Sequence, residues 1–196
     1  MYSYRIEQAI KAATILHQDQ FRKGAVPLPY ISHLIAVMLI VNDYTDSEDH
    51  IVAALLHDTL EDTDYSKDEL TADFGAEVAT IVETVSEPQS TDRKTYSWRE
   101  RKQAYAKQLH AGTEGALLVS AADKIHNMRS IIEEYHQEPA RFLEAFGGTL
   151  DERLQQYQDI ANVLNRRLKN DILSEFNHVF TQYKEFIHYA QEKTKR

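Results

Sequence analysis

A histidine–aspartate pair, His57-Asp58, opens the stretch of this 196-residue chain that is richest in reactive groups. The pair comes directly after the apolar run 53–56, and Glu61 and Asp62 follow it one helical turn later. At about 100° per residue, the four ionisable side chains share one arc of about 140° on a helix. Because buried charges without partners are costly, a divalent cation is an economical partner for such a cluster.

Two further polar residues stand in apolar surroundings and extend this cluster. His33 lies in an otherwise apolar segment, and Asp123 ends the apolar run 117–122. A lone buried histidine is more often a hydrogen-bonded core residue, so the company of the other three groups is what favours metal binding. Two histidines and two aspartates form a mixed nitrogen and oxygen set that suits Mn²⁺ or Fe²⁺, with Zn²⁺ as an alternative. A bound cation of this kind lowers the pKa of water, and Glu61 and Asp62 are candidates to position that water or move its proton.

The composition limits the chemistry that is open to the chain. It has no cysteine, which excludes disulfides, thiolate metal sites, iron–sulfur clusters and thiol nucleophiles. With 22 basic and 31 acidic residues the net charge is −9, which argues against bulk binding of nucleic acid but permits a small anion in a locally basic cleft. No apolar run reaches the roughly 18 residues of a membrane span, and the N-terminus lacks a secretory pattern, so a cytoplasmic protein is expected.

The hydrophobic periodicity is helical nearly throughout, which predicts an all-α fold in a single domain over residues 1–196. Capping boxes at Ser66 and Thr149, each with a glutamate three positions later, mark two helix starts, and Gly75 suits the end of the first. A C-terminal helix over about 170–194 carries an aromatic stripe that is typical of a core or of a subunit interface, so a homodimer is one interpretation. The helices expected before it cover 6–16, 32–41, from 47 through the His-Asp pair, 66–74, 117–132, and from 149 onward.

Several short motifs occur in an order that resembles a known family. They are Arg22-Lys23-Gly24, Pro29-Tyr30-Ile31-Ser32-His33, Ala53-Ala54-Leu55-Leu56-His57-Asp58 through Glu61-Asp62-Thr63, Phe74-Gly75, and Ala122-Asp123-Lys124-Ile125-His126-Asn127-Met128-Arg129. Together they resemble the HD-domain metal-dependent phosphohydrolases, and in particular the stand-alone small alarmone hydrolases of the RelA/SpoT family. The resemblance covers about residues 3–165. Leu34 departs from it, because the family usually has proline after the first ligand histidine.

The resemblance implies a compact helical HD-domain bundle with an additional C-terminal helix, and an enzyme that uses Mn²⁺. It implies hydrolysis of the nucleotides ppGpp and pppGpp, which removes the 3′-pyrophosphate and leaves GDP or GTP. The implied roles are metal binding by His33, His57, Asp58 and Asp123, assistance to the attacking water by Glu61 and Asp62, and nucleotide contacts by Arg22, Lys23, Ser32, Asn127, Arg153 and Tyr157. The basic segment 98–102 would add positive charge near the phosphates, without an indication of which side chain points inward.

Two other functions are compatible with the same residues. An HD phosphohydrolase could act on another nucleotide, such as an adenosine alarmone, the 2′-phosphate of NADPH or a nucleoside monophosphate, because the metal ligands do not distinguish these substrates. A helical protein could instead bind an alarmone or a protein partner without turnover, although the complete ligand set argues against that.

Overall fold

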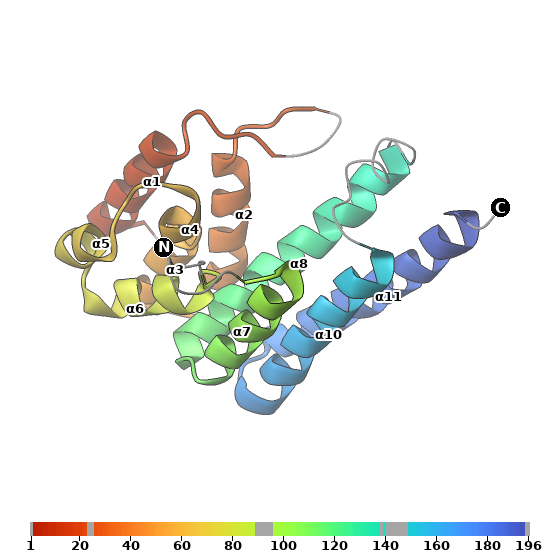
Figure 1. The fold of residues 1–196 in the computed structure, drawn as a ribbon. Coiled ribbons are helices and arrows are strands. Elements are labelled where there is room, and N and C mark those ends of the chain that lie inside the picture. Colours follow the sequence, from red (N-terminus) through yellow and green to blue (C-terminus); the bar gives the residue numbers. More distant parts are fainter. Residues whose placement is uncertain (1, 23–25, 89–95, 138, 140–148, 195–196) are drawn as a thin grey trace.

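The computed structural model describes residues 2–22, 26–88, 96–137, 139 and 149–194. This part of the chain is helical, and its β-type pairing is limited to an isolated bridge between Phe21 and Pro29, which confirms the all-α prediction (Figure 1). The helices are α1 (Tyr4–Leu16), α2 (Ile31–Asn42), α3 (Glu48–Leu56), α4 (Thr59–Asp62), α5 (Lys67–Phe74), α6 (Ala76–Val85), α7 (Trp98–His110), α8 (Glu114–Gln137), α10 (Leu150–Arg167) and α11 (Ile172–Thr194).

Helix α8 forms the centre of the fold. It packs against α2, α3 and α6 on one side and against α10 and α11 on the other, so it joins the two groups of helices seen in Figure 1. Its side chains are buried without interruption from Gly115 to Asp123. The charged Asp123 therefore lies in the interior of the molecule, where a carboxylate needs partners.

Capping boxes start three of the helices. Those at Ser66 and Thr149 were predicted, and in both the hydroxyl accepts from the backbone N–H of the glutamate three residues on while that glutamate accepts from the capping residue. A third, between Ser97 and Glu100, starts α7. The sequence analysis missed it, although the spacing is the same.

The prediction of one continuous helix through the His-Asp pair was wrong. Helix α3 ends at Leu56, and the short α4 begins at Thr59. Local side chains explain the break. The hydroxyl of Thr59 donates to the carbonyl of Leu56 (2.6 Å), and a ring nitrogen of His57 bonds the carbonyl of Ala54 (2.8 Å). These side chains take carbonyls that a continuous helix would pair with backbone N–H groups.

Helix α11 uses its aromatic stripe for packing. Phe176 and Tyr183 are fully buried, and the helix lies against α8 and α10. This agrees with the core interpretation of the stripe, while the homodimer stays a prediction. Gly75 has φ +92°, a region that favours glycine, and it ends α5 as predicted. Helix α6, which follows it directly, was not predicted. Among the described helices, none combines the length and the hydropathy needed to cross a bilayer.

Candidate metal centre

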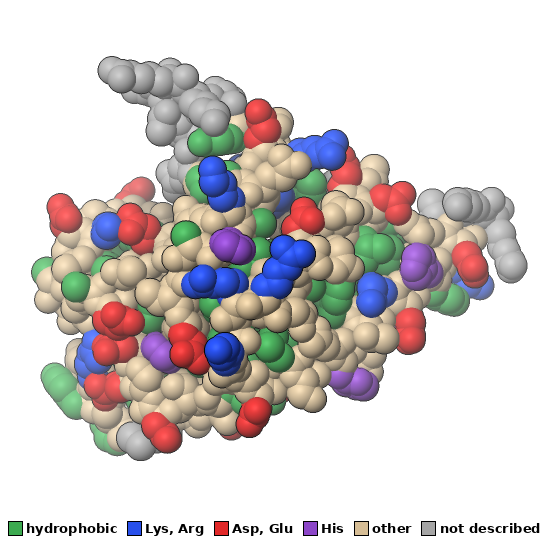
Figure 2. All heavy atoms as spheres, turned by 90° about the horizontal axis from the view of Figure 1, so that it is seen from below, with side chains coloured by type: hydrophobic (Ala, Val, Ile, Leu, Met, Phe, Trp, Pro, Cys, Tyr) green, Lys and Arg blue, Asp and Glu red, His purple; other side chains and the backbone are tan. Residues whose placement is uncertain are grey.

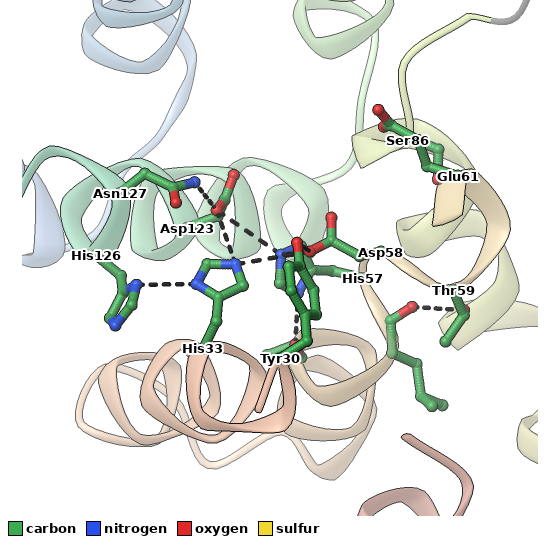
Figure 3. A network of polar contacts seen from close by, with 12 residues as sticks. Tyr30, His33, His57, Asp58, Thr59, Glu61, Ser86, Asp123, His126 and Asn127 are labelled. Carbon is green, nitrogen blue, oxygen red and sulfur yellow. Dashed lines mark hydrogen bonds and ion pairs between the residues drawn. The ribbon is translucent and has the colours of Figure 1, made fainter. Parts of the chain in front are cut away.

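Four predicted ligands from three separate stretches of chain meet in one place (Figure 3). The Nε2 atom of His33, on α2, lies 3.6 Å from Asp58 Oδ2 and 3.4 Å from Asp123 Oδ1. The Nε2 atom of His57 lies 3.1 Å and 3.7 Å from the same two oxygens. Ligand atoms of His33, His57 and Asp58 all lie within 4.8 Å of one another, a spacing that could hold a metal ion.

His57 shows most directly that this centre needs a cation. Its Nδ1 faces the carbonyl of Ala54, and since a carbonyl only accepts, Nδ1 carries a proton. A neutral ring then has a bare lone pair at Nε2, which is buried without a hydrogen-bond partner and faces carboxylate oxygens. Burial opposes a charge on the ring, but Asp58 and Asp123 outweigh it and raise the pKa of His57 to about 10. Either a proton or a metal ion must therefore lie between these groups.

His33 is oriented by a second histidine that the sequence analysis left without a role. Its Nδ1 lies 2.8 Å from Nδ1 of His126, which is on α8. Burial, with additional effects of the neighbouring His33 and Arg22, lowers the pKa of His126 to about 4, so this ring is neutral at pH 7 and can accept a hydrogen bond from His33. His33 Nε2 is then free to coordinate. His126 lies one turn after Asp123, and this i,i+3 spacing was the signal that could have identified it.

The two carboxylates are held by further partners. Tyr30 donates its hydroxyl to Asp58 Oδ2 (2.7 Å), and burial together with the charge of Asp58 raises the pKa of Tyr30. Asp123 Oδ2 pairs with Lys124 (2.5 Å), and its Oδ1 accepts from Asn127. Burial opposes ionisation of both aspartates. His57 and His33 nevertheless hold the pKa of Asp58 well below the usual range, and Lys124 together with the same two histidines does so for Asp123. Both groups are therefore anionic at neutral pH.

The donor set fits a divalent metal ion. The inward nitrogens of His33 and His57 and one oxygen of each aspartate converge, while the outer nitrogens are occupied by His126 and by a carbonyl. Such outer contacts are what orient metal-binding histidines in proteins. Nitrogen and carboxylate donors in this ratio suit Mn²⁺, Fe²⁺ or Zn²⁺.

Two of the predicted nucleotide contacts lie beside the centre. The guanidinium of Arg22 donates to Asn127 Oδ1 (3.0 Å) and lies 5.8 Å from the ring centre of Tyr30. The loop brings them together, because Arg22 N–H bonds Leu28 O (2.8 Å) and Tyr30 N–H bonds Gln20 O (2.9 Å). Lys23 lies outside the described residues.

The other predicted contacts are less directly connected to the centre. Ser32 is exposed, and its hydroxyl donates to the carbonyl of Pro29 (2.8 Å) at the start of α2. Arg153 is half-buried on α10. Tyr157, one turn later, is 5% exposed and packs on Tyr183 with the ring centres 4.7 Å apart. Burial raises the pKa of Tyr157 to about 12, and the charge of Lys124, on α8, opposes that shift.

The two predicted acid–base residues occupy the rim. In Figure 3, Glu61 lies beside Ser86 at the end of α6, on the opposite side of Asp58 from His33. Desolvation raises the pKa of Glu61 to about 7, a hydrogen bond from the Glu87 backbone opposes the shift, and the charges of Glu87 and Asp58 add to it. Desolvation and Asp58 also raise the pKa of Asp62. A carboxyl group that titrates near neutrality, as Glu61 does, suits proton transfer.

In the basic segment 98–102, the side chain of Lys102 is more buried than that of Arg101. Lys102 has 17% of its side chain exposed and pairs with Glu87, whereas Arg101, 3.0 Å from the same carboxylate, is 43% exposed. Figure 2 shows basic side chains gathered around a histidine near the middle of one face, although the chain is acidic as a whole. A local positive field of this kind attracts anionic substrates.

This chain is similar in sequence and in fold to known proteins. A family model described as "HD domain" matches residues 9–146. The mouse protein named guanosine-3′,5′-bis(diphosphate) 3′-pyrophosphohydrolase MESH1 is 37% identical over 166 residues, which are 76% of this chain and 90% of that protein. The human protein of the same name is 36% identical over 156 residues, which are 72% of this chain and 84% of that protein.

Two solved structures share the arrangement of helices. One, described as "A metazoan ortholog of SpoT hydrolyzes ppGpp and plays a role in starvation responses", superposes with a TM-score of 0.75 at 26% identity and covers 93% of this chain and 97% of its own. A crystal structure of a protein from Listeria monocytogenes EGD-e gives a TM-score of 0.64 at 29% identity, over 80% of this chain and 97% of its own.

Proposed function

Because the chain belongs to the HD-domain family, we propose that it is a metal-dependent phosphohydrolase that removes the 3′-pyrophosphate from ppGpp and pppGpp. The products are GDP or GTP and pyrophosphate. The observation that carries the proposal is the convergence of His33, His57, Asp58 and Asp123. The names of the mouse and human relatives state the same activity. The cytoplasm remains the predicted location, and 1–196 the predicted extent of the domain.

The proposed cofactor is Mn²⁺, held by the two Nε2 atoms and by one carboxylate oxygen each from Asp58 and Asp123. When bound, such an ion lowers the pKa of water towards neutrality and attracts electrons from a phosphoryl oxygen. Tyr30, His126 and Lys124 support this set, because each fixes the orientation of one ligand.

Glu61 and Asp62 are the proposed proton acceptors. Water attacks the phosphorus bonded to the ribose 3′ oxygen, the bond between that phosphorus and the 3′ oxygen breaks, and the 3′ oxygen takes up a proton. The proton released by the water passes to one of the two rim carboxylates. The pKa of about 7 for Glu61 supports this role, because such a group accepts and releases protons at physiological pH.

Basic side chains on two elements compensate the charge of the substrate. Arg22 lies beside the centre in the loop before α2, and Lys124 lies next to Asp123 on α8. Preorganised cations in a cleft stabilise the charge that develops on the transferred phosphoryl group. We assign the remaining nucleotide contacts to Lys23, Ser32, Asn127, Arg153 and Tyr157, as the family resemblance implies.

The test is turnover of a nucleotide panel by the purified protein with Mn²⁺. We expect pyrophosphate and GDP from ppGpp, and no product from the Asp58→Asn variant. The panel includes an adenosine alarmone, NADPH and nucleoside monophosphates. Turnover confined to one of those would retain the metal chemistry and refute the substrate, whereas no turnover of any compound at high enzyme concentration would refute the function.

A further inference from the structure

Glu87 joins three parts of the rim that are separate in the chain. It follows α6, its backbone N–H donates to Glu61 Oε2 (2.9 Å), and its carboxylate faces α7. No role for this residue follows from the metal centre, which it does not contact in the described network. It nevertheless lies between Glu61, a proposed proton acceptor, and the cations Arg101 and Lys102, so it can affect proton transfer by Glu61.

The carboxylate of Glu87 forms ion pairs with two neighbouring cations of α7, Arg101 and Lys102. Arg101 Nε lies 3.0 Å from Oε2, and Lys102 Nζ pairs with Oε1. The side chains of Glu87 and Lys102 are 15% and 17% exposed, so the pair is largely withdrawn from solvent, where charge interactions are stronger than at an open surface. The ammonium of Lys102 also lies 5.7 Å from the centre of the Trp98 ring, within the range of a cation–π contact.

Glu61 is surrounded by charges of both signs. Asp58 and Asp62 face it from its own segment, and Glu87 faces it from the segment after α6. Lys102, on α7, lies close enough for Glu61 to act on it electrostatically. If Lys102 paired directly with Glu61, the carboxylate would be stabilised as an anion and would become a weaker base.

We propose that Glu87 is a positioning residue for Glu61: its N–H fixes the carboxylate of Glu61 at the rim, and its own carboxylate keeps Lys102 and Arg101 from pairing with that base. The inference rests on the proposed function for the catalytic role of Glu61. The contact geometry itself does not depend on the substrate.

The Glu87→Gln variant tests this directly, because it retains the N–H and the size of the side chain but removes the charge that occupies the two cations. We expect the acidic limb of the pH profile of kcat/KM to move about one unit lower, because Glu61 loses an anionic neighbour and gains a cationic one. Lys102→Met should move the limb in the opposite direction. Glu83→Gln, a change at an exposed glutamate of α6, is the matched control and should leave the profile in place.

A second measurement does not depend on activity. The titration of the Glu61 carboxyl group can be followed by carbon NMR in the metal-free protein, with the signal assigned from its loss in Glu61→Gln. We expect a midpoint of about 7 in the unsubstituted protein, lower in Glu87→Gln and higher in Lys102→Met. A purely structural role for Glu87 would lower the melting temperature without moving either midpoint, and that result, or unchanged midpoints in both variants, overturns the proposal. Lack of ppGpp turnover alongside shifted NMR midpoints would refute the proposed function and leave the positioning role intact.

Discussion

Two buried polar atoms in different parts of the molecule both lack a hydrogen-bond partner in the described structure. One is Nε2 of His57 at the metal centre, and the other is the hydroxyl oxygen of Tyr183 on α11. The nitrogen lies 3.1 Å from one carboxylate oxygen and 3.7 Å from another. The hydroxyl belongs to a ring that packs on Tyr157 and, at 5.9 Å between ring centres, on Phe186.

The difference between the two sites lies in the charges around them. At His57, two anions and a lone pair converge, and they repel one another until a cation separates them. At Tyr183 the ring packs on aromatic rings, and Arg153 is a single cationic neighbour rather than a set of converging like charges. The cost there is one unsatisfied neutral hydroxyl, about 1–3 kcal/mol. An unpaired buried atom therefore indicates a ligand where like charges converge, and ordinary packing where they do not.

The largest effect should come from His57→Ala. Loss of one ligand removes several kcal/mol of transition-state stabilisation, so we expect kcat/KM for ppGpp to fall by about 10³-fold or more. Metal content, measured by mass spectrometry after gel filtration, should fall with it. His178→Ala, at an exposed histidine of α11, is the control and should retain both. A His57→Ala protein with full activity would show that the unpaired nitrogen of His57 does not indicate a ligand.

Metal binding should compete with a proton at the same centre. In the metal-free protein the pKa of His57 is about 10, above its usual 6.5, so its protonated form stabilises the fold fully below pH 6.5, and this contribution is lost as the pH rises through about 10. Because Mn²⁺ displaces that proton, its affinity should rise about tenfold per pH unit between pH 6 and 8. Isothermal titration calorimetry in buffers of different ionisation enthalpy checks this by counting released protons. An affinity that does not change with pH would contradict the arrangement.

The support of His33 by His126 should matter less than a ligand but still measurably. We expect His126→Phe to weaken Mn²⁺ affinity or turnover by about 10–100-fold, because His33 loses the acceptor that fixes its tautomer. His126→Asn places an amide oxygen in reach of the same nitrogen and should restore part of the loss. Equal defects in the two variants, measured by Mn²⁺ titration, would show that ring packing rather than the hydrogen bond is required.

The smallest effect is expected at the other unpaired atom. Tyr183→Phe removes the unsatisfied hydroxyl and keeps the ring contacts with Tyr157 and Phe186, so the free energy of unfolding should stay the same or rise by about 1 kcal/mol. Urea denaturation measures this change, and ppGpp turnover should not change. A tenfold loss of turnover would mean that this hydroxyl serves the substrate, and the distinction between the two regions would not hold.

Local spacing was enough to predict most of the helices, although not α6 and α7, and part of the centre. Apolar residues three and four apart and the capping boxes at Ser66 and Thr149 depend only on neighbours within one or two turns. The contact between Asp123 and Asn127 also follows from helical spacing. Even the break after Leu56 has a local cause, in bonds to the carbonyls of Leu56 and Ala54, but helical periodicity alone does not show which side chains will take those carbonyls.

What the sequence determined by itself is therefore the all-α fold and the set of residue types that can bind a cation. Tertiary structure decided which ring nitrogen of His33 points inward, because the other nitrogen bonds His126, 93 residues away in the chain. It also decided that the side chain of Lys102 is more buried than that of Arg101. These contacts join elements that are distant in the chain, and their geometry depends on how α2, α7 and α8 pack. Helical periodicity places a side chain on a face of its own helix, but only the packing of the other helices determines what that face meets.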